Sequence, residues 1–535
     1  MPRVVWGIVA LHLAIVLCQT AVFPNFRAPD ERQHADLIVM VEQGKAWPWP
    51  GPGELDVSKG SRAGGFTTST RAPERMHLPD RAVPERDDRA SYVDAGGAET
   101  GPSFNQLIQH PPLYYLTGAA FLSAIPGWED VPFDRVYLLL RWWNALLTAA
   151  LPLLLWATAR RLRLPRPLPV AAALVPLAIP ELTRNESAIN NDNLLVVLMA
   201  AVTWLVARVL TGDTSRRTAL WIGVLTTLAL LTKGFALLLP AWIGLVYLVA
   251  ARRYDRRAAS TSLVIAWVTS APGALWWAHN KLTYGSIQPD GRTSEPTEVV
   301  ARYGWSDGGA LWLHNLVERV GTLFFMQDQS GRRLHDVSWK AAWLAIALVV
   351  LAVLVTLALR TLARSTTLLL LVPVVGLFLI VASGTWANFV TERNLYSGMQ
   401  GRYLYGGLVG LGVVAVAAAA RLRDRVRWCV PLAVLVVAVG LQLLYLRSVL
   451  ELFWAPRSAS GVSALDIGVR AIYHWYALPP AVLLFVMAST VTAGLAVAYS
   501  LARPGKRRPP SASAPVIAAR APSDQEVGIP LHAAR

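Results

Sequence analysis

Residues 191–217 read NDNLLVVLMAAVTWLVARVLTGDTSRR. A polar start leads into an apolar run that extends to residue 210, and a pair of arginines, Arg216 and Arg217, closes the stretch. About 20 residues of helix are needed to cross the hydrocarbon core of a bilayer. A run of this length between polar ends therefore predicts a transmembrane helix, with its arginines on the cytoplasmic side.

The same pattern recurs along the whole chain of 535 residues. Apolar runs occupy residues 4–23, 136–158, 167–183, 191–210, 218–232, 235–251, 258–281, 339–360, 366–386, 402–420, 427–447 and 472–501. These runs predict an all-α polytopic membrane protein with about 12 transmembrane helices, within a range of 11–13. The composition agrees, because 54% of the residues are apolar and 16% are charged, whereas soluble proteins carry about a quarter charged residues. Two cysteines exclude a disulfide scaffold.

Basic residues set the expected orientation. They gather between alternate pairs of runs, at 160–166, 208–217, 252–257, 360–364 and 421–427, at Arg3, and in the tail from Arg503. The positive-inside rule places all of them, and both termini, in the cytoplasm. These segments hold 24 basic and 5 acidic residues, against 26 basic and 29 acidic in the remainder. The net charge of +16 is therefore read as a topology signal, and nucleic-acid binding is not supported.

The expected organisation follows from these assignments. It comprises a first transmembrane helix (1–23), a long extracytoplasmic loop with an acidic motif and juxtamembrane helices (24–135), transmembrane helices (136–281), a second extracytoplasmic loop (282–338), further transmembrane helices (339–502) and a disordered cytoplasmic tail (503–535). Residues 111–125 are apolar but short, which favours a juxtamembrane or re-entrant helix over a short true span. The Pro-, Gly- and charge-rich stretch between Trp47 and Ser103 predicts little regular structure.

An acidic motif follows the first run directly. Asp30, Glu31 and His34 lie in the segment Pro-Asp-Glu-Arg-Gln-His at 29–34. Asp30 and His34 would share one face of a helix. We predict Asp30 as a catalytic general base, with Glu31 tuning its pKa or binding the acceptor. The alternative is a solvated helix start, where acidic residues are favourable.

Further polar residues collect at the expected outer ends of the helices. The candidate substrate-binding residues are His34, His110, Arg141, Asn191, Asp192, Lys233, Arg402 and Tyr403. A Lys or an Arg at this depth can hold a phosphate group. The alternatives are a lysine that extends to the lipid headgroups and interfacial aromatic residues that anchor a helix.

The order of these motifs resembles the GT-C superfamily of membrane glycosyltransferases. The similar features are an acidic pair after the first span, His-Pro-Pro at 110–112, an Asn/Asp turn, Thr-Lys-Gly at 232–234 and Gly-Arg-Tyr at 401–403. The protein O-mannosyltransferase and lipid A aminoarabinose transferase branches look closest. The resemblance implies that a hexosyl or pentosyl group is transferred, with inversion, from a polyprenyl-phosphate donor to an extracytoplasmic glycan, lipid or protein.

The resemblance also assigns roles. Asp30 matches the catalytic Asp of the family, His110 the residue before Pro-Pro, and Lys233 and Arg402 candidate phosphate contacts. No cofactor is required, although a divalent metal could assist through Glu31 or Asp192. The expected location is the plasma membrane, and the expected process is biogenesis of the cell envelope and wall. A polytopic transporter or lipid-linked-sugar flippase is the alternative, and a non-catalytic scaffold is a third possibility.

Overall fold

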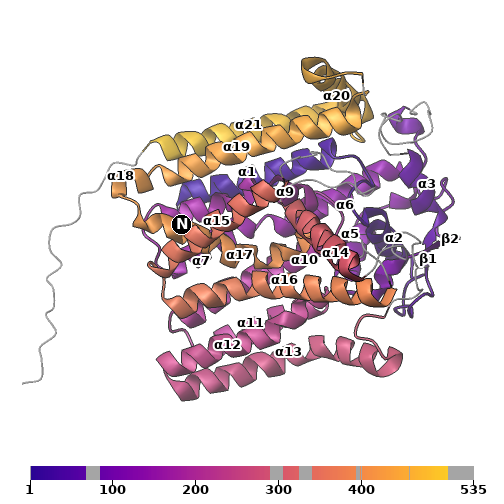
Figure 1. The fold of residues 1–535 in the computed structure, drawn as a ribbon. Helices are drawn as coiled ribbons and strands as arrows, with labels where there is room; N and C mark the ends of the chain where they lie inside the picture. The colour runs from indigo at the N-terminus through magenta and orange to yellow at the C-terminus, as the bar shows by residue number, and fades with distance from the viewer. Residues whose placement is uncertain are drawn as a thin grey trace, which may run out of the picture.

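The computed structural model describes residues 2–67, 85–289, 305–323, 340–392, 398, 400–456 and 458–503. Long helices lie side by side in one bundle (Figure 1). In these residues, nine apolar helical stretches are long enough to cross a membrane. They contain α1 (Arg3–Val22), α6 (Phe133–Thr148) with α7 (Leu151–Arg161), α10 (Asn191–Leu210), α12 (Leu238–Arg253), α13 (Arg256–Tyr284), α16 (Arg364–Glu392), α17 (Leu408–Ala418), α18 (Asp424–Arg427) with α19 (Val430–Val449), and α21 (Pro480–Ala502). The prediction of an all-α polytopic membrane protein is confirmed.

The remaining three predicted runs also form helices. Two of these helices are α11 (Arg216–Leu230) and α15 (Lys340–Leu359). The run at 167–183 is divided into α8 (Leu168–Leu174), a 3-10 turn and the start of α9 (Pro180–Glu186). Prolines explain the division, because each lacks the N–H group that would continue a helical ladder. Of the predicted tail, residues 504–535 lie outside the described part of the chain.

Short elements gather at one end of the bundle (Figure 1). They are α2 (Glu31–Glu42), β1 (Asp56–Ser58), α3 (Lys59–Thr67), β2 (Thr100–Phe104) and α5 (Leu113–Ser123). The short helix α20 (Gly461–Trp475) lies at the same end (Figure 1), and α14 (Trp305–Val320) contacts α16. Strands β1 and β2 pair antiparallel, with Asp56 opposite Phe104 and Ser58 opposite Thr100. The expectation that 47–103 lacks regular structure is therefore wrong for these residues.

A buried carboxylate holds this ribbon against α2. Asp36 accepts hydrogen bonds from the backbone N–H and the hydroxyl of Ser58, at 3.0 and 2.6 Å, and from the Asn105 amide at 3.0 Å. These bonds join α2 to β1 and to the residue that follows β2. The sequence of residues 47–103 does not indicate this strand pairing, because Asp36, whose side chain fixes the ribbon, lies outside that stretch.

Helix α5 has 11 residues and so measures about 16 Å, half the thickness of a hydrocarbon core. It packs closely against α2, since a Cβ on Gly118 would lie 2.8 Å from the side chain of Ile38. That this segment does not span the bilayer stays a prediction.

Helix α10 lies in the middle of the bundle (Figure 1). Its apolar residues belong to two separate core clusters: Met199 and Val202 pack with α11 and α12, while Val196 and Ala200 pack with α7 and α17. The helix is thereby fixed on both sides. Its N-terminus faces the end of the bundle that carries α2 and α5, and there it presents polar side chains.

Candidate functional site

The N-terminus of α10 opens the candidate site. Asn190 is the N-cap, and its side-chain oxygen accepts a hydrogen bond from the Asp192 N–H at 2.8 Å. Such a cap satisfies one of the free N–H groups of a first helical turn. The cap fixes Asn191 and Asp192 at the start of α10, where their side chains contact Lys233 and Arg402.

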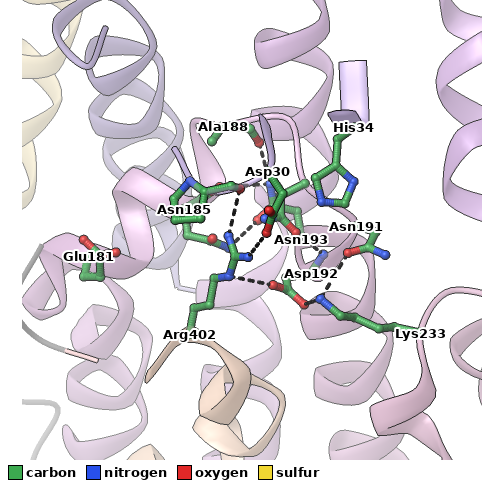
Figure 2. A network of polar contacts seen from close by, with 12 residues as sticks. Asp30, His34, Glu181, Asn185, Ala188, Asn191, Asp192, Asn193, Lys233 and Arg402 are labelled. Atoms are coloured by element: carbon green, nitrogen blue, oxygen red, sulfur yellow. Dashed lines mark hydrogen bonds and ion pairs between the residues drawn. The ribbon is translucent and has the colours of Figure 1, made fainter. Parts of the chain in front are cut away.

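Asp192 lies between two buried cations (Figure 2). Its Oδ1 is 2.6 Å from Lys233 Nζ, and its Oδ2 is 3.3 Å from Arg402 Nε. Lys233 Nζ also donates to Asn191 Oδ1 at 3.3 Å. One carboxylate therefore joins two positive charges that come from different parts of the chain.

Asp30 extends the network on its other side. Arg402 donates from Nη2 to Asp30 Oδ2 at 3.1 Å and from Nη1 to the Pro29 carbonyl at 3.2 Å. Gln106 donates to the second oxygen of Asp30 at 3.0 Å. Asp30 precedes α2 with a left-handed backbone, φ +60°, and 26% of its side chain is exposed, against 4% for Arg402. Asp30 is thus the accessible end of the network.

The two cations are held by short irregular segments. Arg402 lies on a 3-10 segment, η7 (Gly401–Gly407), which passes so close to Leu323 that a Cβ on Gly401 would lie 2.2 Å from the Leu323 nitrogen. Lys233 lies in the break between α11 and the 3-10 turn Gly234–Leu237. The ring of Tyr403 faces Lys233, with its centroid 4.9 Å from Nζ. The structure thus brings Asp30, Asn191, Asp192, Lys233, Arg402 and Tyr403 together, as candidates drawn from distant motifs.

Buried amides hold the turn before α10. The Asn193 amide donates to the carbonyls of Asn185 and Ala188, at 3.1 and 2.9 Å, and to Asn144 Oδ1 at 3.1 Å. Asn144 also accepts from the Tyr114 hydroxyl at 2.9 Å. Asn144 and Asn193 were not among the sequence candidates. An available signal was the presence of an amide within the apolar run 136–158, where an unpaired polar group is costly.

Glu31 and Arg141 form a separate pair. Arg141 donates from Nε and Nη2 to the two Glu31 oxygens, each at 2.8 Å, and neither side chain is exposed. The other guanidinium N–H groups bind the carbonyls of Thr20, Phe23 and Pro24. The Glu31 oxygens also accept the N–H groups of Phe26 and Ile189, both at 3.1 Å. Every oxygen of Glu31 is occupied, which favours a positioning role over the predicted catalytic one.

The two candidate histidines lie beside the network. His34 Nδ1 is 3.0 Å from the Tyr115 hydroxyl, and both His34 and His110 are buried. Burial lowers the pKa of both histidines well below the usual value, and the positive charges of Lys233 and Arg402 lower it further. Both imidazoles are therefore neutral at physiological pH.

The residues of this network combine two chemical properties. Its accessible end is a carboxylate able to accept a proton, and its interior holds two cations able to bind a phosphate. Within the described residues, no group of three or more His, Cys, Asp and Glu side chains could hold a metal ion. Metal assistance through Glu31 or Asp192 stays a prediction.

Comparisons with known proteins give the following matches. A family model described as "Predicted membrane protein (DUF2142)" matches residues 13–411. No curated protein matches the chain. The chain is similar to crystal structures of ArnT from Cupriavidus metallidurans, in the apo state (14% identity over 93% of this chain and 77% of that chain, TM-score 0.43) and bound to undecaprenyl phosphate (13%, 92% and 75%, TM-score 0.41). It is also similar to the oligosaccharyltransferase AglB from Archaeoglobus fulgidus in complex with an inhibitory peptide and a dolichol-phosphate (12%, 92% and 56%, TM-score 0.36).

Proposed function

The chain belongs to the DUF2142 family of predicted membrane proteins, and we propose that it is a glycosyltransferase that uses a polyprenyl-phosphate sugar as its donor. One observation carries the proposal. Asp30, Arg402, Asp192 and Lys233 come from four separate segments and form one continuous chain of ion pairs. A carboxylate at the accessible end of two buried cations is the inventory that transfer from a phosphate leaving group requires.

The proposed reaction is a single displacement at C1 of the sugar. An acceptor hydroxyl or amine attacks C1 while Asp30 takes its proton. The bond between C1 and the phosphate oxygen breaks, and the electron pair leaves with the phosphate. Lys233 and Arg402 hold the phosphate as its charge increases. Attack opposite the leaving group inverts the configuration at C1, and no second acid is needed, since a bound phosphate leaves without protonation.

The charge of the ligand-free ion-pair network determines how a donor phosphate could bind there. Two carboxylates and two cations make the ligand-free network neutral. A phosphate oxygen therefore has to replace a carboxylate oxygen beside Lys233 or Arg402. Asp192 bridges both cations, so it occupies the position that a phosphate bound to both would take. We expect Asp192 to yield this position when the donor binds.

Location and acceptor are part of the proposal. The donor keeps its lipid tail in the bilayer, so its C1 lies at headgroup depth, and a site at the ends of membrane helices meets that requirement. The positive-inside distribution of arginines supports a site on the extracytoplasmic face of the plasma membrane. The acceptor class is a glycan, a lipid or a protein of the cell envelope.

The test is transfer by the purified chain. Purified protein is incubated with a panel of radiolabelled polyprenyl-phosphate sugars and membrane extract, and labelled product is measured. Asp30→Asn should lower the rate by at least about 100-fold, the usual contribution of a general base. Asp466→Asn is the matched control, because Asp466 pairs with Arg470 at the exposed surface of α20, and it should keep full activity. Full activity of Asp30→Asn would contradict the assignment of the base.

One observation favours the transporter or flippase alternative. His12 lies near the middle of α1, and its Nε2 is 2.8 Å from Glu186 Oε2, with both side chains buried. Ionisable groups in the interior of a transmembrane helix often mark a transport pathway. Uptake of a lipid-linked sugar by reconstituted protein, without product, would support this alternative over transfer.

A further inference from the structure

Aromatic side chains form a cluster beside the two histidines. The ring of Tyr115 stacks on His34, with centroids 5.9 Å apart, and Trp49 lies 5.6 Å from Tyr115. Trp276 meets Trp49 edge to face at 6.4 Å. These four rings come from α2, the segment after it, α5 and the end of α13. We call them, together with His110, the aromatic subsite.

Hydrogen bonds fix the aromatic subsite next to Lys233. The indole N–H of Trp49 donates to the Ile108 carbonyl at 3.0 Å. The N–H of Leu113, at the start of α5, donates to the Leu231 carbonyl at 3.2 Å, two residues before Lys233. The start of α5, which carries Tyr115, therefore lies close to the segment that carries Lys233.

Two buried polar atoms of the aromatic subsite are available to a ligand. Among the residues that the structure describes, the buried indole N–H of Trp276 and the buried Nδ1 of His110 have no hydrogen-bond partner. The neighbouring Trp277 donates its indole N–H to the Leu230 carbonyl at 3.0 Å, and Trp242 donates to Leu369 at 2.7 Å. A buried polar group without a partner is costly, so such groups in a native protein call for a ligand or a water.

We propose that the aromatic subsite binds the sugar ring of the donor, a pyranose. The inference rests on the proposed glycosyltransferase function. Aromatic faces pack against the C–H face of a pyranose, and a few polar atoms among aromatic walls are typical of small-molecule sites. The Trp276 N–H donates to a ring hydroxyl, and His110 Nδ1 exchanges a hydrogen bond with another.

Binding measurements on the purified full chain in detergent separate this inference from the reaction itself. The probes are a short-chain polyprenyl phosphate and the same lipid carrying glucose. The wild type should bind the glucosyl lipid more tightly than the bare phosphate lipid. Trp276→Phe keeps the ring and removes the donor, so it should reduce that preference by about five-fold. Trp49→Leu should reduce it by a similar factor or more.

A neighbouring tryptophan supplies the control. Trp277→Phe removes an indole whose N–H is bound to the backbone, and it should leave the preference for the glucosyl lipid unchanged. Thermal unfolding of each variant shows that it is folded. If the wild type binds no phosphate lipid, the proposed function fails. If it binds phosphate lipids but Trp276→Phe and Trp49→Leu keep the full preference, the sugar subsite is refuted while the function stands.

Discussion

Asp30 and Glu31 are adjacent in the chain, but we expect Asp30 to act in transfer and Glu31 to stabilise the fold. The variant Glu31→Gln tests this difference. Glu31 accepts four hydrogen bonds, two from Arg141 and one each from the N–H groups of Phe26 and Ile189. A glutamine keeps one acceptor oxygen and turns an NH2 group toward donors. It also leaves the charge of Arg141 buried without a counter-charge.

The expected loss is large. Removing one partner of a buried ion pair costs about 3–5 kcal/mol, because the other charge stays buried and unpaired. This is a large share of a total stability of about 5–15 kcal/mol. Asp30→Asn should instead change the free energy of unfolding by about 1 kcal/mol or less, since Asp30 is partly exposed and an asparagine can still accept from Gln106 and Arg402.

Denaturant unfolding of detergent-solubilised protein measures both changes. A second substitution, Arg141→Met, supplies the control: the double variant Glu31→Gln/Arg141→Met should recover part of the loss, because no unpaired charge remains. Glu31→Gln with wild-type stability would refute the reasoning. Wild-type stability together with lost transfer would restore Glu31 to the catalytic role that its sequence position suggested.

Two further predictions concern pH and backbone packing. The pKa of His34 and of His110 is lowered in the folded protein, so the unfolded chain binds more protons than the folded chain below pH about 6.5. The free energy of unfolding should therefore fall as the pH falls, by up to about 1.4 kcal/mol per pH unit for each histidine. Unfolding between pH 7.5 and 5.5 checks this, and His34→Gln/His110→Gln should flatten the slope. Gly401→Ala should abolish transfer, because its Cβ would collide with the Leu323 backbone. Gly440→Ala should keep transfer, because its Cβ would meet no atom of the described residues within 4 Å. Steady-state transfer rates of the two variants test this prediction.

Apolar run length predicted most of the fold. Every predicted run is helical for most of its length, although the runs at 167–183 and 472–501 are each divided between two helices. A run of about 20 apolar residues has few other ways to satisfy its backbone in lipid. The ribbon of β1 and β2 escaped prediction, since Asp36, which organises it, lies 20 residues earlier in the chain. The composition of residues 47–103 indicates only their local conformational preference. It gives no information about a hydrogen-bond partner elsewhere in the chain, such as Asp36.

Site residues could be predicted from the sequence where polar side chains stand at the ends of apolar runs. Asp192, Lys233 and Arg402 each stand at the end of an apolar run, and the structure joins them. The sequence could not distinguish Asp30 from Glu31, because consecutive residues at a helix start project in different directions. The direction depends on the left-handed backbone of Asp30 and on the position of Arg141, more than 100 residues away.

The carboxylate of Asp192 explains how two cations persist in the interior without a ligand. A buried Lys or Arg is tolerated only with a partner, and Asp192 serves both Lys233 and Arg402. A phosphate that replaces this carboxylate meets cations already held by the break after α11, which carries Lys233, and by η7, which carries Arg402. Preorganised charges need little rearrangement during the reaction. The same residue therefore stabilises the ligand-free fold and sets the geometry that a donor would use.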